Sequence, residues 1–90
     1  MIYEVRTYDL QPRSLPEVIK RFGEGYEERK TLSELAGFFY TEIGPLNQIV
    51  HIWPYEDLAE RERVRKESMG LKNWPPATAE FITHMTIEIY

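Results

Sequence analysis

Residues Phe38–Tyr55, FFYTEIGPLNQIVHIWPY, decide the fold. Two stretches rich in aromatic and β-branched side chains, residues 38–43 and 48–55, flank the turn-forming sequence Gly44-Pro45-Leu46-Asn47. Such a pattern is typical of two antiparallel strands joined by a turn. The sequence therefore predicts a β-hairpin in the middle of the chain.

The turn sets the expected pairing within this hairpin. With Pro45 and Leu46 at its two central positions, Phe39 pairs with Ile52 and Tyr40 pairs with His51. Neighbouring residues of a strand point to opposite faces, so the two pairs mark the two faces of the sheet.

The segments on either side extend this hairpin into a larger sheet. Residues 1–9 and 84–90 alternate as strands do. Ser14 starts a helix that continues through Tyr26, and residues 56–69 form a second helix, followed by a short helical turn ending at Phe81. The order β-α-β-β-α-β predicts a ferredoxin-like α+β fold, with a four-stranded antiparallel sheet and two helices on one face.

The first helix contains two glycines, Gly23 and Gly25. Each weakens a helix by about 1 kcal/mol relative to alanine. Either the backbone packs closely against another segment there, or the helix is loose at its end.

Length and composition narrow the classes of function. The 90 residues form a single domain, 1–90, because two stable cores would need about 50 residues each at least. A net charge of −4 disfavours nucleic-acid binding, the absence of cysteine excludes thiolate chemistry, and no stretch is apolar enough to enter a membrane. We expect a cytoplasmic protein.

Alternation along the strands divides the predicted sheet into two faces. The mostly apolar set is expected beneath the helices: Tyr3, Val5, Thr7, Phe39, Val50, Ile52, Met85, Ile87 and Ile89. The other face carries Ile2, Glu4, Arg6, Tyr8, Phe38, Tyr40, Glu42, Ile49, His51, Trp53, His84, Thr86, Glu88 and Tyr90. This second face is too apolar for solvent, so we expect a homodimer in which two sheets face each other.

Three stretches of the chain resemble the NIPSNAP family. Residues 3–8, YEVRTY, resemble its opening strand, residues 39–53, FYTEIGPLNQIVHIW, resemble its most distinctive hairpin, and Tyr55 with residues 58–61 resembles the entry to its second helix. The resemblance covers nearly the whole chain. It implies a dimeric α+β barrel, and it adds little on chemistry because the family's biochemical activity is poorly defined.

A ligand cavity is expected between the two sheets of the dimer. Its candidate ligand-binding residues are Arg6, Tyr8, Tyr40, Glu42, His51, Trp53 and His84. The two histidines are general bases or metal ligands in one interpretation and hydrogen-bonded interface residues in the other. Arg6 either binds an anionic or carbonyl-bearing ligand or forms a structural ion pair with Glu42 or Glu88. We expect no bound metal or cofactor.

Two classes of function stay open. The first is a homodimeric domain that binds a small hydrophobic or aromatic molecule, or acts as an interaction module, without catalysing a reaction. The second is a small oxygenase of the dimeric α+β barrel type, either cofactor-independent or haem-handling. No catalytic motif is identified, and fold analogy alone does not decide between the two.

Overall fold

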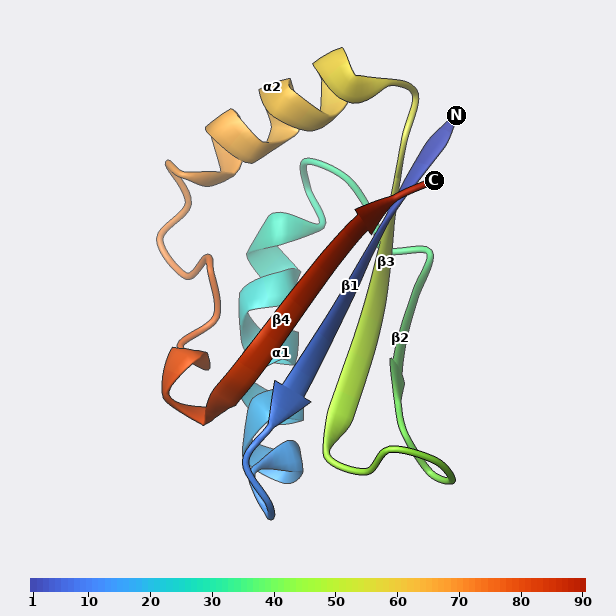
Figure 1. Ribbon diagram of the computed structural model, residues 1–90. Helices are drawn as coiled ribbons and strands as arrows, with labels where there is room; N and C mark the ends of the chain where they lie inside the picture. Colours follow the sequence, from blue (N-terminus) through green and yellow to red (C-terminus); the bar gives the residue numbers. More distant parts are fainter.

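A computed structural model describes all 90 residues and confirms the ferredoxin-like α+β fold. The strands are β1 (Ile2–Leu10), β2 (Gly37–Tyr40), β3 (Gln48–Tyr55) and β4 (Ile82–Ile89). The helices are α1 (Leu15–Arg29) and α2 (Leu58–Ser68), and a 3-10 turn, η1 (Ala79–Phe81), precedes β4 as predicted. Figure 1 shows both helices on one side of the sheet, with the two chain ends close together.

The four strands form one antiparallel sheet in the order β2-β3-β1-β4. The long strands β1 and β3 occupy its centre and pair over their whole length, from Ile2 opposite Tyr55 to Asp9 opposite Gln48. The short strand β2 and the strand β4 form the edges. The central pair therefore offers the longest surface on which a site can be built.

Local sequence accounts for the starts of both helices. Pro16 falls in the first turn of α1, where the missing N–H costs no hydrogen bond. The hydroxyl of Ser14 donates to the Gln11 carbonyl oxygen and does not cap the helix. At α2 the Asp57 carboxylate accepts from the Glu60 N–H and caps the helix.

The β2–β3 hairpin has a longer loop than predicted. Strand β2 ends at Tyr40, and Phe39 pairs with Val50 while Tyr40 pairs with Ile49. The predicted pairing is therefore wrong by two residues. Because side chains alternate with a period of two, Phe39 still shares a face with Ile52, and Tyr40 still shares a face with His51. The loop takes up the difference with left-handed backbone at Gly44 and Asn47, φ 122° and 59°.

The predicted assignment of faces is wrong for β1, β2 and β3. Trp53 packs beneath the helices against Phe22 of α1 and Val64 of α2, and only 2% of its surface is exposed. His51 lies on the same side, with its ring centroid 5.0 Å from that of Phe22. Glu4, on the neighbouring strand, is 1% exposed. Glu4, His51 and Trp53, which were expected between two copies of the chain, are therefore enclosed within one.

The prediction failed because it assumed that the more apolar face must be the covered one. Here both faces of the sheet are rich in apolar side chains, and the polar groups beneath the helices bond to one another. Only in β4 is the assignment right, since Met85 and Ile87 pair with Tyr8 and Arg6 and so face the helix side. The helices leave them 45% and 44% exposed.

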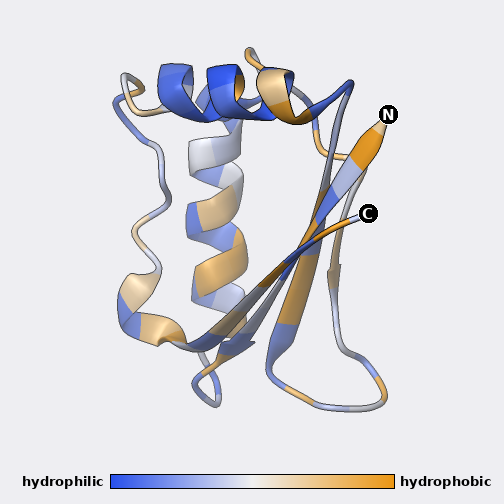
Figure 2. Cartoon of the chain, turned by 45° about the horizontal axis from the view of Figure 1, so that its top comes forward, coloured by the Kyte–Doolittle hydropathy of each residue, from blue (hydrophilic) through white to orange (hydrophobic).

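The helix-free face of the sheet, called the open face below, is apolar along its centre. Val5, Val50 and Ile52 lie there only partly exposed, flanked by Tyr3 and Phe39, which are 44% and 57% exposed. Figure 2 marks the alternation of hydrophobic and hydrophilic residues along these strands, and the contrast with the hydrophilic α2.

The two glycines of α1 differ in their surroundings. A Cβ at Gly25 would lie 2.8 Å from the Asn73 carbonyl oxygen and 3.3 Å from the Trp74 ring, whereas a Cβ at Gly23 would meet nothing within 4 Å. Close packing against another segment, one of the two alternatives raised by the sequence, thus explains the glycine at position 25. It places residues 73–76 against α1.

We predict opposite effects of alanine at these two positions. Gly25→Ala forces the 73–76 backbone away and is expected to lower the free energy of unfolding by about 1–3 kcal/mol. Gly23→Ala gains helix propensity and is expected to raise it by up to about 1 kcal/mol. Urea unfolding followed by circular dichroism measures both, and equal effects of the two substitutions would contradict the packing.

Candidate functional site

A cavity of about 580 Å³ lies between the sheet and the helices of the protomer. Its floor is the helix side of β1 and β3, its walls are α1 and α2, and residues 74–79 together with the start of β4 complete the rim. Small-molecule sites in proteins typically measure about 300–1,000 Å³. The cavity is therefore large enough for an organic molecule, and it lies within one chain.

His51 stands at the centre of the cavity floor, and Trp53 fixes its protonation. The Trp53 Nε1–H donates to His51 Nδ1 at 2.8 Å. An indole N–H can only donate, so Nδ1 must be the unprotonated nitrogen and the neutral ring carries its hydrogen on Nε2. That Nε2 is buried and has no hydrogen-bond partner in the protein.

The environment keeps this histidine neutral. Burial, together with the positive charge of Arg6, lowers the pKa of His51 from 6.5 to about 3, against the opposing effect of Glu4. At neutral pH this cavity-lining ring thus carries one unpartnered N–H donor, and it has no proton-accepting atom free. Leaving such a donor unpaired costs about 1–3 kcal/mol.

A buried carboxylate ties the sheet to α2. Glu4 accepts from Arg6 Nη1 at 3.0 Å and from Arg61 Nε, so each of its oxygens has a cationic partner. Burial alone would raise the pKa of Glu4, but the hydrogen bonds from Arg61 and Arg6 outweigh it and hold the pKa below its usual value. The carboxylate is therefore charged and fully engaged.

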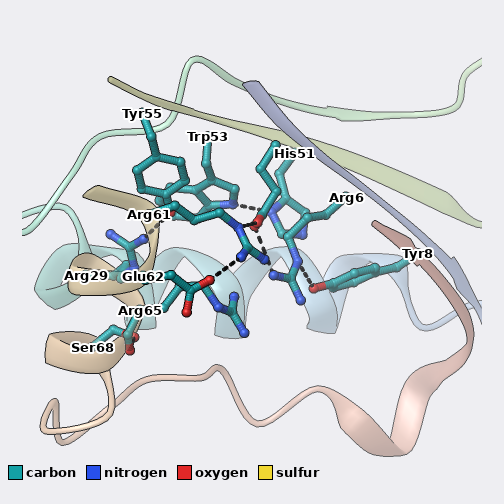
Figure 3. Close-up of polar contacts among 11 residues, drawn as sticks. Arg6, Tyr8, Arg29, His51, Trp53, Tyr55, Arg61, Glu62, Arg65 and Ser68 are labelled. Carbon is teal, nitrogen blue, oxygen red and sulfur yellow. Dashed lines mark hydrogen bonds and ion pairs between the residues drawn. The ribbon is translucent and has the colours of Figure 1, made fainter. Parts of the chain in front are cut away.

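Arg6 also orients the phenol of Tyr8. Its Nε donates to the Tyr8 hydroxyl oxygen at 2.8 Å, and the Tyr8 ring meets the His51 ring edge-on at a centroid distance of 4.8 Å. Burial raises the pKa of Tyr8, so the phenol keeps its hydrogen. Arg6, Tyr8 and His51 thus present N–H and O–H groups side by side (Figure 3).

Arg29 is a cavity residue that sequence reasoning missed. Its guanidinium donates to the Tyr55 hydroxyl at 3.0 Å and to Ser33 Oγ at 2.9 Å, and it lies 4.3 Å from the centroid of the Trp53 ring. Only 3% of the residue is exposed. A basic residue in the last turn of a helix normally faces solvent, so the sequence held no signal for this role.

The structure brings together four of the seven predicted site residues. Arg6, Tyr8, His51 and Trp53 all line the cavity, although it lies beneath the helices and not between two sheets. Three others do not reach it. Tyr40 is half-exposed at the end of β2, Glu42 is exposed in the β2–β3 loop, and His84 is exposed on the open face of β4.

The predicted polar partners also differ. Arg6 forms a structural ion pair, as one alternative proposed, but with Glu4 and not with Glu42 or Glu88. The two histidines lie on opposite faces of the sheet and cannot act as a pair. No three His, Asp or Glu side chains converge in a way that could hold a metal ion.

The fold and this cavity define the class of the protein: a ferredoxin-like α+β domain with a cavity between its sheet and its helices. The NIPSNAP family model matches residues 3–90, and the chain belongs to the NIPSNAP family. It is 41% identical over 88 residues to the NipSnap homolog of Dictyostelium discoideum, covering 98% of this chain and 38% of that protein. The chain thus spans about two fifths of the length of this curated relative.

Solved structures agree with this assignment. A NIPSNAP family protein of unknown function from Agrobacterium tumefaciens is 36% identical and superposes with a TM-score of 0.90, over 100% of this chain and 86% of that one. An antibiotic biosynthesis monooxygenase shares the fold with a TM-score of 0.74 at 14% identity, over 100% and 96% of the two chains. Neither helix of this chain is long and apolar enough to cross a membrane.

The low pKa of His51 predicts how stability depends on pH. The unfolded chain takes up a proton on this ring below pH 6.5 and the folded chain does not, so the free energy of unfolding falls as the pH falls toward about 3. We expect a loss of about 2 kcal/mol between pH 7 and pH 5 from this one group. Urea unfolding at a series of pH values measures it.

Two histidine variants test whether His51 causes this loss of stability at low pH. His51→Phe removes the buried ring nitrogen atoms and is expected to flatten the profile in this pH range, whatever its absolute stability. His84→Gln changes an exposed ring on the open face and serves as the matched control. A profile that stays as steep in His51→Phe as in the unmodified protein would rule out His51 as its origin.

Proposed function

We propose that this NIPSNAP domain binds a small, mainly apolar organic molecule in the cavity between its sheet and helices. The observation that carries the proposal is the unpartnered His51 Nε2–H, buried at the floor of a 580 Å³ cavity. Buried polar groups are nearly always satisfied, and a ligand with an acceptor atom would satisfy this one. Phe22, Ile49 and Trp74 supply apolar walls.

Binding explains this site better than the oxygenase alternative. A general base or a haem ligand needs a free lone pair on a ring nitrogen, and in His51 the Trp53 N–H occupies the lone pair of Nδ1 and leaves the hydrogen on Nε2. The low pKa also makes His51 a weak base. The likeness to the monooxygenase concerns the fold alone.

A neutral fluorescent probe tests the cavity. Prodan (6-propionyl-2-dimethylaminonaphthalene), a neutral naphthalene with a carbonyl acceptor and no N–H or O–H group, is expected to gain fluorescence on binding, and Met85→Trp, which fills the rim, is expected to weaken its binding about tenfold. Thr86→Trp is the matched control, because the neighbouring side chain of β4 faces away from the cavity. Absence of binding, or equal weakening in both variants, would refute a ligand site here.

We further propose that two copies of the domain associate through their open faces. Val5, Val50 and Ile52 form a continuous apolar strip there, flanked by the exposed rings of Tyr3 and Phe39. A second copy related by a two-fold axis would cover this strip with an identical one. The residues that support the dimer thus differ from those expected from the sequence, and the two cavities stay separate.

A charge on the open face tests this association. We expect the protein to sediment as a dimer at micromolar concentration, and Ile52→Lys to sediment as a monomer, because two buried ammonium groups would meet at the interface. Leu58→Lys, an exposed apolar residue of α2, is the control and should stay dimeric. A monomeric unmodified protein would refute the proposal.

A further inference from the structure

At the cavity floor, more hydrogen-bond donors than acceptors are left without a partner in the protein. His51 Nε2–H has no partner, the Tyr8 hydroxyl accepts from Arg6 but donates to no protein group, and Arg6 Nη2 donates to none. All three residues line the cavity. A ligand that fits this floor must bring acceptor atoms and not further N–H or O–H groups.

The carboxylate at the floor cannot supply those acceptors. Glu4 is 1% exposed, and its two oxygens already accept from Arg6 and Arg61. The remaining lining carboxylate, Glu62, is held by Arg61 at 2.8 Å on the exposed side of α2. The donors at the floor are therefore left for a ligand.

The cavity lining also carries an excess of positive charge in a chain whose net charge is −4. The cations among the lining residues are Arg6, Arg29, Arg65 and Lys66, and the carboxylates are Glu4 and Glu62. Arg65 and Lys66, in the last turn of α2, form no ion pair with any acid of the chain. The overall acidity of the protein is thus reversed at this one place.

We infer that the ligand of this cavity is an apolar carboxylic acid, bound as its anion. The inference rests on the proposed ligand site and names its chemical class. The carboxylate accepts from His51, Tyr8 and Arg6 at the floor, and the apolar body contacts Phe22, Ile49 and Trp74. Arg65 and Lys66, which are exposed on the α2 wall, attract the anion and favour its entry.

A pair of isosteric probes tests the charge of the ligand. 2-Naphthoate and 2-naphthamide have the same ring system and carbonyl, and only the first is an anion. We expect 2-naphthoate to bind at least tenfold more tightly, measured by titration followed in ¹H–¹⁵N spectra. Trp53 and Trp74, the two tryptophans of the chain, both line the cavity, so their indole N–H signals report binding there.

Exposed variants of α2 test the origin of the preference without disturbing the core. Arg65→Gln/Lys66→Gln is expected to weaken 2-naphthoate about fivefold, since each exposed charge contributes little on its own, and to leave 2-naphthamide unchanged. Arg63→Gln on the same helix is the control, because Arg63 does not line the cavity. Equal weakening by Arg63→Gln would overturn the role of the Arg65 and Lys66 charges.

The remaining outcomes separate the inference from the proposed function. Equal binding of the two naphthalenes, or binding of 2-naphthoate without a change in the indole signals, overturns the acid assignment. So does failure of both 2-naphthoate and 2-naphthamide when Prodan still binds, and in that case the ligand site stands. Failure of all three compounds overturns the ligand site itself.

Discussion

The 2.8 Å hydrogen bond from Trp53 Nε1 to His51 Nδ1 is the interaction on which the rest of the site depends. The two residues are neighbours on the same face of β3, so the strand itself sets their distance. Because the indole can only donate, the neutral histidine carries its hydrogen on Nε2. One local contact thus determines the tautomer of His51 and leaves this cavity-lining residue with a donor and no free acceptor.

The cavity exists because α2 is held to the sheet by charge more than by apolar packing. Val64 and Ser68 are the only buried residues of that helix, while Arg61 reaches down to the buried Glu4 of β1. A helix with a broad apolar face would settle onto β1 and exclude solvent. The ion pair fixes α2 in place and leaves the space between it and the floor unfilled.

Local patterns in the sequence predicted the elements of the fold, and a resemblance predicted the family. The alternation of residues 48–55 gave β3 its observed bounds, since strand periodicity is a local property. The choice of face is not local: it depends on which polar groups find partners in three dimensions. Glu4 and His51 are polar in the sequence, yet Arg61 and Trp53 make their burial tolerable.

The same reasoning explains which site residues were found. Arg6, Tyr8, His51 and Trp53 were selected as one set because they share a face of two adjacent strands, and that relation holds whichever side the helices cover. Tyr40, Glu42 and His84 were assigned to that face from predicted strand bounds and pairings that the structure does not have. Strand β2 ends at Tyr40, so Glu42 lies in the loop, and the pairing of His84 with Asp9 places His84 on the open face. Arg29 was missed because it is the only charged residue of α1 that is buried.

The central claim concerns the proton on His51, and ¹⁵N spectroscopy of the histidine rings tests it most directly. Long-range ¹H–¹⁵N correlations distinguish a ring protonated on Nε2 from one protonated on Nδ1 and from the charged form. The structure predicts a neutral His51 ring with its hydrogen on Nε2 from pH 7 down to pH values approaching 3. A His51 ring that is charged at pH 6, or that carries its hydrogen on Nδ1, would contradict the account.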